Sequence, residues 1–286
     1  MKDLVYDRNI RFFGKAGQQN LAGAHVAIVG IGGLGTHVVQ QLALLGVGHL
    51  ALIDDEDLDV TNRNRYVGVR SDDPIPGSWK VAIGERLAKE INPGICVAPI
   101  RQSLAGPQAF EAIIQADYVF GCLDNEGARL VLNEFCAAYS RPYFDLASDI
   151  LPDGSYGGRV CVAWEGQGCL VCCGELDMAQ AKADLETPEA RANREAIYGV
   201  PREALDQAGP AVVSINGVVA SLAVSEFMLG VTEIRPPKRL CRYRGDRGIV
   251  VTVTDDPAPD CYYCKGIRGM GADSGVQRYL TTAAAK

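Results

Sequence analysis

The first chemically informative stretch runs from His25 to Val39 and reads HVAIVGIGGLGTHVV. It matches the pattern G-x-G-x-x-G between an apolar, strand-like run and a helix-like run. In that context the first glycine permits a tight turn, the second lets the backbone approach a phosphate, and the third packs the helix on the strand. The helix N-terminus then directs its amides at the anion. The glycines are Gly30, Gly32, Gly33 and Gly35.

An acid follows the next strand-like run, where ribose hydroxyls are usually bound in such folds. Asp54 stands about 19 residues after Gly35. With this acid in place, the glycine pattern predicts a nucleotide site. The pattern does not distinguish an NAD-dependent oxidoreductase from an enzyme that uses ATP.

Cationic and amide side chains gather after Asp54, in DDEDLDVTNRNRYVG over residues 54–68 and in GSWK over residues 77–80. Hydride transfer requires a pocket for a flat nicotinamide, whereas cleavage between the α- and β-phosphates requires fixed cations and donors. A solvated charged loop is the alternative interpretation of this composition. The side chains in question are Asn62, Arg63, Arg65 and Lys80.

Asp124 and Asn125 come directly after the apolar run YVFGCL. This places them at the carboxyl edge of the expected sheet, where ligands bind in α/β folds. A carboxylate there could hold Mg²⁺ between phosphate oxygens. It could also cap the helix that begins at Glu126.

Strand-like and helix-like segments alternate over residues 25–147, which predicts an α/β, Rossmann-like, largely parallel sheet with helices on both faces. After residue 147 the pattern changes to two hairpins, one turning at residues 152–155 and one at residues 246–247, so antiparallel strands should extend the sheet. The expected strands are 25–29, 49–54, 95–100, 118–123 and 143–147, and the expected helices are 34–46, 78–92, 107–116 and 125–139.

The second half of the chain contains a polar stretch, an apolar stretch and a glycine-rich end. Residues 174–209 are polar and predict a crossover loop with a weak helix at 188–197. Residues 211–229 are apolar, but their interruption by Ser, Asn and Glu favours a buried helix over a membrane span. Residues 266–286 are expected to be poorly ordered. We find no clear linker, so residues 1–286 are expected to form one domain.

Composition narrows the functional classes. The formal net charge of -7 argues against a nucleic-acid surface. We find no secretion signal, and ten cysteines without one indicate a reducing compartment, so a cytoplasmic location is expected. The patterns G-x-S-x-G and G-x-x-x-x-G-K-[ST] are absent, which excludes the usual serine hydrolase and P-loop sites.

Two C-x-x-C pairs stand far apart in the chain, CLVC at Cys169 and Cys172 and CYYC at Cys261 and Cys264. Four thiolates can close a tetrahedral zinc site, and such sites are usually structural because no coordination position is left open. Two disulfides are the alternative and are disfavoured in a reducing cell. The metal would tie residues 169–172, after the first hairpin, to residues 261–264.

Taken together, these motifs resemble the ThiF/MoeB family of ATP-dependent adenylyltransferases, relatives of the ubiquitin-activating enzymes. The resemblance covers roughly residues 6–264 and adds a Tyr-x-Arg motif at Tyr6 and Arg8. Glu56 stands where the family more often has Asp. The same pair of C-x-x-C motifs recurs in the family. The matching residues are Arg8, Gly30, Gly32, Gly33, Gly35, Asp54, Glu56, Asn62, Arg65, Lys80, Asp124 and Asn125.

The resemblance implies roles for these residues. Asp54 would hold the ribose, the Asn62, Arg65 and Lys80 side chains would hold the phosphates, and Asp124 would bind magnesium. Arg8 would reach the phosphates bound by the partner subunit of a homodimer.

Many relatives carry a nucleophilic cysteine in the crossover loop, where it forms a thioester. Here the matching position is Leu205, and no cysteine lies between Gly174 and Leu240. We therefore expect the reaction to stop at the acyl-adenylate, unless another cysteine such as Cys173 substitutes.

The resulting hypothesis is ATP-dependent adenylation of the C-terminal glycine of a small ubiquitin-like or sulfur-carrier protein ending in Gly-Gly, with release of pyrophosphate. The expected cofactors are ATP, magnesium and zinc. Three alternatives remain open: adenylation of a short peptide, as in peptide-antibiotic synthesis, an NAD-dependent oxidoreductase, and a non-catalytic scaffold that has kept the fold.

Overall fold

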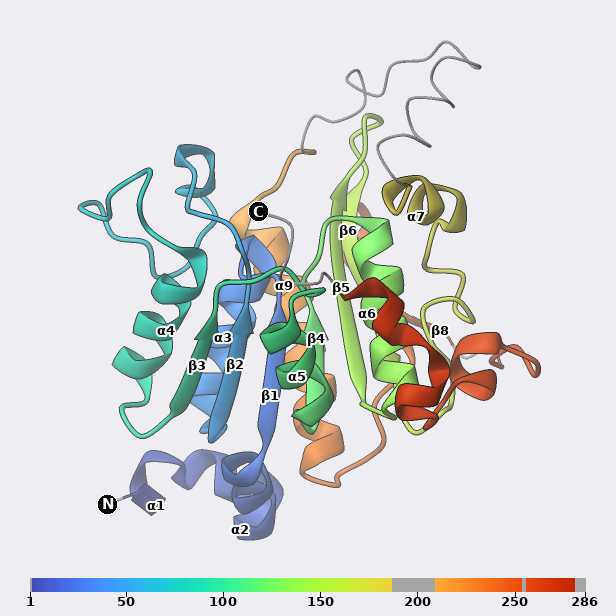
Figure 1. Ribbon diagram of the computed structural model, residues 1–286. Coiled ribbons are helices and arrows are strands. Elements are labelled where there is room, and N and C mark those ends of the chain that lie inside the picture. Colours follow the sequence, from blue (N-terminus) through green and yellow to red (C-terminus); the bar gives the residue numbers. More distant parts are fainter. Residues whose placement is uncertain (1, 187–208, 254–255, 281–286) are drawn as a thin grey trace.

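The computed structural model describes residues 2–186, 209–253 and 256–280, and the described strands form one eight-stranded sheet (Figure 1). The strand order is β3-β2-β1-β4-β5-β6-β7-β8. The first five strands in this order are parallel, and β6, β7 and β8 join antiparallel. The strands are β1 (His25–Val29), β2 (His49–Ile53), β3 (Cys96–Ile100), β4 (Tyr118–Gly121), β5 (Tyr143–Ile150), β6 (Tyr156–Ala163), β7 (Leu240–Arg244) and β8 (Ile249–Val253).

The predicted fold class is confirmed, since strands and helices alternate through β5 and two hairpins complete the sheet. The central strands are buried on both faces because helices cover both sides, and β1 is buried at four consecutive positions after His25. β3 forms the edge and carries Pro99, a residue that sheets tolerate at an edge because it cannot donate to a ladder.

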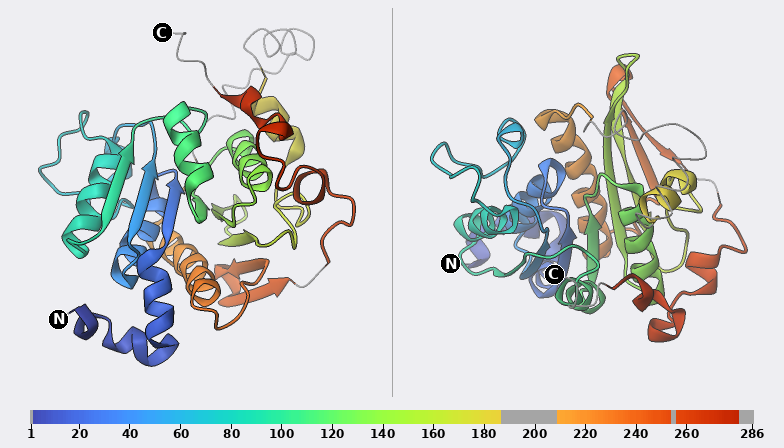
Figure 2. Two further views of the ribbon diagram at one scale, coloured as in Figure 1. Left: turned by 60° about the horizontal axis from the view of Figure 1, so that its bottom comes forward. Right: turned by 45° about the horizontal axis from the view of Figure 1, so that its top comes forward.

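Helices cover the two faces of the sheet separately (Figure 2). On one face, α3, α4 and α9 share a core with side chains such as Leu42, Val81 and Phe227. On the other face, α5 and α6 share a core that includes Phe110 and Phe135. These helices are α3 (Gly33–Leu45), α4 (Lys80–Ile91), α5 (Pro107–Gln115), α6 (Glu126–Ala138) and α9 (Val213–Val231).

α9 is the one described helix that is long and apolar enough to cross a membrane. In the structure Val219, Ala220, Ala223 and Phe227 are fully buried in the core. The expectation of a buried core helix is therefore confirmed.

The N-terminal helices α1 (Lys2–Val5) and α2 (Asp7–Gly23) were not among the predicted elements. Gly14 interrupts α2 with a left-handed φ of 75°, which breaks the helical period of the sequence. The helix is nevertheless held in place, because Leu21 is fully buried and the Gln18 amide donates to the carbonyl of Leu45 at 2.9 Å.

The expected disorder after residue 266 is wrong for residues 266–280. Two short 3-10 helices, η5 (Gly271–Ser274) and η6 (Val276–Tyr279), lie there. Val276 is fully buried, and the Tyr279 hydroxyl donates to Glu134 of α6 at 3.1 Å. Burial of these side chains against α6 offsets the conformational freedom that the glycines confer.

The expected crossover loop also contains more structure than its composition indicated. α7 (Met178–Asp184) forms within it, capped by Asp177, whose carboxylate accepts from the backbone N–H groups of Ala179 and Gln180. The expected helix at residues 188–197 lies outside the described residues.

Candidate functional site

The glycine turn joins β1 to α3 at the carboxyl edge of the sheet. Gly30 adopts a φ of 88°, and a Cβ there would lie 2.6 Å from the carbonyl oxygen of Cys122, so only glycine fits. A side chain at Gly35 would collide with the carbonyl of Gly30, which places α3 directly against the turn. In contrast, a Cβ on Gly32 would meet nothing within 4 Å. The space beside Gly32 is therefore open to a ligand phosphate.

α3 begins at Gly33 without any side-chain cap at its N-terminus. Its first backbone N–H groups are consequently available to an anion. A Cβ on Gly33 would lie 2.5 Å from the Nδ2 atom of Asn216 and 3.5 Å from Cγ and Cδ of Arg65. Two polar side chains thus converge on the first residue of this helix.

Asp54 links the end of β2 to the glycine turn. One carboxylate oxygen accepts from the Ile31 backbone N–H at 2.7 Å and the other accepts from the Glu56 N–H at 2.9 Å. Burial raises the pKa of the Asp54 carboxyl, and the nearby Lys80 charge opposes that rise. Each oxygen keeps a second lone pair, so Asp54 can hold the turn and still accept a ribose hydroxyl.

The loop after Asp54 is organised by its own polar side chains. Asp59 and Asn62 form a capping box around the 3-10 turn η1 (Val60–Asn62), in which the Asn62 amide oxygen accepts from the Asp59 N–H at 3.0 Å. The Arg65 guanidinium donates to the carbonyl of Thr61 and to the Asn64 side chain. Arg65 is therefore held beside the glycine turn, and the Asn62 amide nitrogen is the group left for a phosphate.

Arg63, a member of the predicted cationic group, binds within its own loop. Its guanidinium donates to the carbonyls of Ser71 and Asp73, each at 3.1 Å. These bonds brace the loop from within. The expectation that Arg63 gathers with the phosphate-binding cations is therefore wrong.

Lys80 begins α4 and lies against Glu56. Its side chain is only 10 % exposed, and its ammonium pairs with the Glu56 carboxylate, which is 68 % exposed. Two backbone contacts fix the position of Lys80: its N–H donates to the Glu56 carbonyl at 3.2 Å, and the Tyr66 hydroxyl donates to its carbonyl at 2.9 Å. The structure thus holds a cation and the acid Asp54 on the same edge as the glycine turn.

Asp124 and Asn125 follow β4, and the structure separates the two functions weighed for this pair. Asn125 is the helix cap, since its side chain accepts from the Ala128 N–H at 2.8 Å. Asp124 is exposed, and in the described part of the chain no hydrogen bond or ion pair holds its carboxylate. A free carboxylate beside the glycine turn fits the oxygen ligation that Mg²⁺ prefers.

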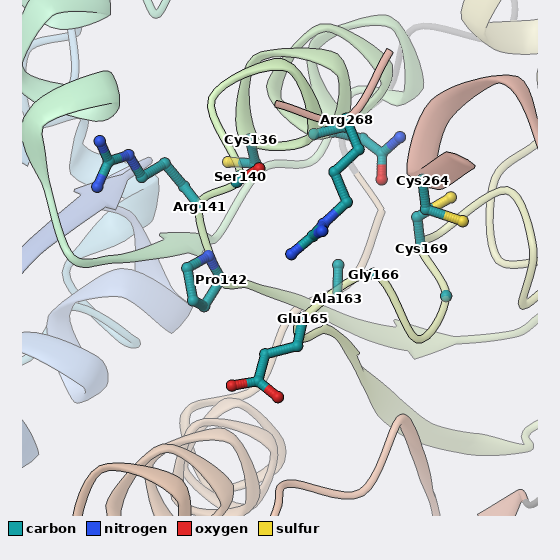
Figure 3. A pocket seen from close by; sticks show the side chains of 13 residues that line it. Cys136, Ser140, Arg141, Pro142, Ala163, Glu165, Gly166, Cys169, Cys264 and Arg268 are labelled. Atoms are coloured by element: carbon teal, nitrogen blue, oxygen red, sulfur yellow. The ribbon is translucent and has the colours of Figure 1, made fainter. Parts of the chain in front are cut away.

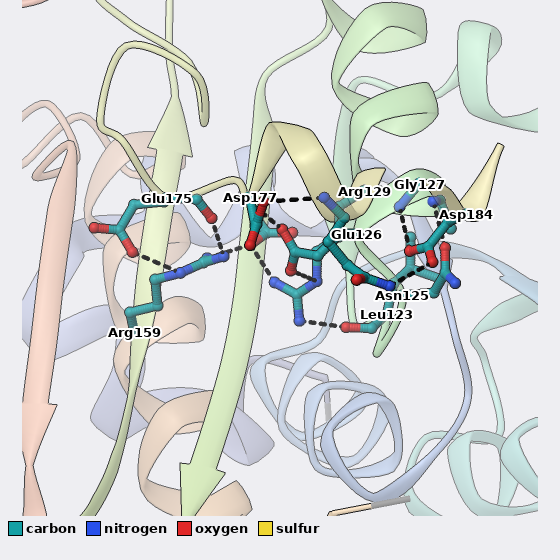
Figure 4. A network of polar contacts seen from close by, with 12 residues as sticks. Leu123, Asn125, Glu126, Gly127, Arg129, Arg159, Glu175, Asp177 and Asp184 are labelled. Atoms are coloured by element: carbon teal, nitrogen blue, oxygen red, sulfur yellow. Dashed lines mark hydrogen bonds and ion pairs between the residues drawn. The ribbon is translucent and has the colours of Figure 1, made fainter. Parts of the chain in front are cut away.

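A buried ionic network supports this edge and was not predicted (Figure 4). Asp145 is fully buried and accepts from Arg129 at 2.9 Å, from the Tyr143 hydroxyl at 2.7 Å and from Arg159. Arg129 also donates to the carbonyl of Leu123, the residue before Asp124. The network therefore fixes the backbone that presents the Asp124 carboxylate. Its signal in the sequence is weak, because isolated charges in a strand or helix do not reveal their partners.

The same network holds the start of the crossover segment against α6. The Asp177 N–H donates to Glu126 at 2.9 Å, and the Gly127 N–H donates to Asp184 at 3.1 Å (Figure 4). α7 consequently lies over the N-terminus of α6. The position of Leu205, at which relatives place a nucleophilic cysteine, lies outside the described residues.

Arg8 is the predicted site residue that the structure does not bring to this edge. The ring of its neighbour Tyr6 packs on Gly46, where a Cβ would lie 2.6 Å from Cζ. Gly46 ends α3, a helix of 13 residues, so it lies about 20 Å from the glycine turn that begins it. Arg8 is exposed at this far end.

The four cysteines of the two C-x-x-C pairs converge. Their Sγ atoms all lie within 4.8 Å of one another, with Cys169 to Cys261 at 3.7 Å and Cys172 to Cys264 at 3.3 Å. Zinc with four thiolates at their usual bond length separates the sulfur atoms by about 3.8 Å, so the set fits a structural zinc ion. Burial raises the pKa of Cys264 to about 12, and metal binding would therefore displace its proton.

A pocket lies beside this cluster (Figure 3). It is lined by Cys169 and Cys264 and by Cys136 and Ser140, which lie at the C-terminal end of α6 and just beyond it. Asn125 and the glycine turn lie at the opposite end of that helix. The pocket is therefore separate from the nucleotide edge.

Comparisons with known proteins identify the family of this chain. The ThiF family model matches residues 6–263. The sulfur carrier protein ThiS adenylyltransferase of Escherichia coli K12 is 29% identical over 218 residues, which span 75% of this chain and 76% of that protein. The molybdopterin-synthase adenylyltransferase of the same organism is 34% identical over 175 residues, 60% of this chain and 68% of that protein. Among solved structures, E. coli MccB with MccA-N7isoASN matches with a TM-score of 0.71 at 21% identity, over 91% of this chain and 74% of that one, which shows a common fold.

Proposed function

This chain belongs to the ThiF family, and from that premise we propose that it transfers the adenylyl group of ATP to the C-terminal carboxylate of a small ubiquitin-like or sulfur-carrier protein ending in Gly-Gly. The named relatives with sequence similarity are adenylyltransferases, one of them for the sulfur carrier ThiS. The enzyme would act as a single adenylation domain in the cytoplasm.

The observation that carries the proposal is the convergence of Asp54, Arg65, Lys80 and Asp124 around one glycine turn. In the proposed step a carboxylate oxygen of the carrier attacks the α-phosphorus of ATP. The new O–P bond forms as the bond from the α-phosphorus to the bridging oxygen breaks, and pyrophosphate leaves with that electron pair. The acyl-adenylate and pyrophosphate together account for all atoms of the carrier and ATP.

The residues at the edge would act by position and charge. Arg65 and Lys80 neutralise charge that develops on the phosphates, and the Asn62 amide nitrogen adds a donor. Asp54 would accept from the ribose, and Asp124 would hold a magnesium ion, which would supply positive charge to the phosphates. Alignment of the carboxylate with the α-phosphorus supplies the remaining rate acceleration, so the reaction needs no covalent intermediate with the enzyme.

We also propose that the protein is a homodimer, because of the position of Arg8. Within one chain Arg8 lies at the far end of α3, but Arg8 of the partner subunit could reach the phosphates in a two-fold assembly. We also propose that Cys169, Cys172, Cys261 and Cys264 hold a structural zinc ion.

The substrate is tested by mass spectrometry. The protein is incubated with ATP, magnesium and either a ThiS-type carrier ending in Gly-Gly or a formylated short peptide with a free carboxylate. We expect the carrier mass to rise by one adenylyl group, and the rise to vanish for a carrier lacking its last two glycines. If only the peptide gains mass, the substrate is a short peptide and the proposal of a carrier-protein substrate is wrong.

A further inference from the structure

The N-terminus of α9 lies beside the N-terminus of α3, and both helices start at the nucleotide edge. The two helices run parallel, since Asn216 faces Gly33, Gly217 faces His37 and the Gln41 amide donates to the Ser221 hydroxyl at 3.1 Å one turn later. α9 begins at Val213 and, like α3, has no side-chain cap. Of the polar residues in the first turn of α9, Ser214 is exposed, and Asn216 is the one that contacts the glycine turn.

Asn216 is that polar group. It is only 3 % exposed, although it belongs to an otherwise strongly apolar helix. The Ser148 hydroxyl of β5 donates to its amide oxygen at 2.7 Å, and this bond turns the Nδ2 atom towards Gly33. The Nδ2 atom itself is not among the fully buried unpaired atoms of the described residues, so it stays open to solvent or to a ligand at the turn.

The Nδ2 donors have no acceptor of their own. In the part of the chain that the structure describes, no oxygen takes a hydrogen bond from this nitrogen, although the rest of the Asn216 side chain is packed. The nitrogen lies 2.5 Å from the site that a Cβ on Gly33 would occupy, at the first residue of α3. The unused donor is therefore aimed at the same place as the free amides of that helix.

We propose that Asn216 binds ATP directly, by donating from Nδ2 to a phosphate oxygen at the N-terminus of α3, and that Ser148 is the positioning residue that orients this amide. The inference rests on the proposed function, because it requires ATP at the glycine turn. It also explains Gly33, since any side chain there would displace the Asn216 amide from the turn.

The alternative is that Asn216 serves only to pack α9 on β5. The two interpretations differ in which ligand loses affinity. A phosphate donor contributes to the binding of ATP but not to that of adenosine, whereas a packing defect at the turn weakens both.

The experiment measures binding of α,β-methylene-ATP and of adenosine by calorimetry for the wild-type protein and four variants. Asn216→Leu removes the donors at similar volume, and Asn216→Asp keeps an acceptor for Ser148 but places a carboxylate against the phosphates. Ser148→Ala frees the amide to rotate. Gln41→Ala is the matched control, because it removes a polar contact between α3 and α9 that lies away from the turn.

We expect Asn216→Leu to lower the affinity for the ATP analogue by about tenfold or more, because hydrogen bonds to charged groups are stronger than neutral ones. Asn216→Asp should lower this affinity by at least as much. Ser148→Ala should cause a smaller loss, and Gln41→Ala should bind as the wild type does. Adenosine affinity should stay unchanged in all four variants.

Two results would overturn the inference while leaving the proposed function intact: wild-type affinity for the analogue in both Asn216 variants, or an equal loss for adenosine and the analogue. A wild-type protein that binds no ATP analogue would overturn the proposed function, and this inference with it.

Discussion

The Lys80 ammonium pairs with the Glu56 carboxylate, and the two side chains differ sharply in exposure, at 10 % and 68 %. Lys80 is held by the backbone of α4 and by its burial, whereas Glu56 extends into solvent. An incoming phosphate would therefore displace the exposed acid and keep the buried cation. This asymmetry is the arrangement that charge stabilisation in a transition state requires.

The first prediction concerns the two cations nearest the turn. Lys80→Ala and Arg65→Ala should each lower the adenylation rate on the order of a hundredfold or more, because preorganised charge supplies much of the stabilisation. Arg101→Ala is the control, since Arg101 also follows a parallel strand but is held by Trp79 and Asp57. A loss below about threefold for Arg65→Ala would count against its assigned function.

The second prediction separates Asp124 from its neighbour. Asp124→Asn should raise the magnesium concentration needed for half-maximal adenylation by about tenfold or more, because a neutral amide binds the ion more weakly. Asn125→Ala should instead lower stability by about 1 kcal/mol through loss of the α6 cap, with little change in magnesium dependence. Titration of magnesium in steady-state assays, paired with chemical denaturation, checks both.

The third prediction concerns the cysteine cluster. Cys169→Ser should lower zinc content and the midpoint of thermal unfolding together, since metal binding at such sites contributes directly to folding. Cys136→Ala, a change at a buried cysteine outside the cluster, should leave zinc content at the wild-type level. Metal analysis of purified wild-type protein that finds no zinc, at undiminished stability, would refute the assignment.

The fourth prediction concerns acid stability. The Arg86 guanidinium donates to Asp73 and lowers the pKa of that buried carboxyl from 3.8 to about 2. A depressed pKa in the folded state means that the pair stabilises the fold above about pH 4 and loses this contribution as the pH falls towards 2. At about 1.4 kcal/mol per pKa unit, the contribution is roughly 2 kcal/mol.

Asp73→Asn should therefore flatten the dependence of the unfolding free energy on pH between 4 and 2, as measured by urea denaturation across that range. An unchanged slope in the variant would show that Asp73 does not titrate in this window. Because the pair anchors the loop that Arg63 also braces, the variant should also raise the mobility of the segment that carries Arg65.

The fifth prediction tests Arg8 across subunits. Arg8→Ala and Lys80→Ala proteins should each be inactive alone, yet a mixture allowed to exchange subunits should regain activity. In a mixed dimer, the site that keeps Lys80 also receives the intact Arg8 of the partner subunit. If the subunits exchange but adenylation activity does not return, Arg8 does not act on the site of the partner subunit.

Sequence reasoning could predict the parts of the site that depend on local pattern. The glycine turn, Asp54, Lys80 and the Asp124–Asn125 pair all follow strands, and parallel strands deliver their ends to one edge. The four-cysteine cluster was likewise predictable, because the spacing within each C-x-x-C pair is typical of metal ligands. The fold class was predictable because the alternation of strands and helices is also visible in the local sequence pattern.

The parts that were missed depend on contacts between distant segments. Nothing local indicates that Asn216 lies over Gly33, or that Asp145 gathers Arg129 and Arg159, because each side chain is polar within an apolar run. The order after residue 266 was missed for a similar reason, since it depends on how Val276 is buried against α6 rather than on its glycine-rich composition.

The most direct measurement of the central claim is the exchange of labelled pyrophosphate into ATP by the wild-type protein in the presence of a carboxylate-ended carrier and magnesium. The account predicts exchange that requires the carrier and is lost in Lys80→Ala. Absence of exchange with every carboxylate-ended protein and peptide tried, together with tight binding of NAD at the glycine turn, would contradict it.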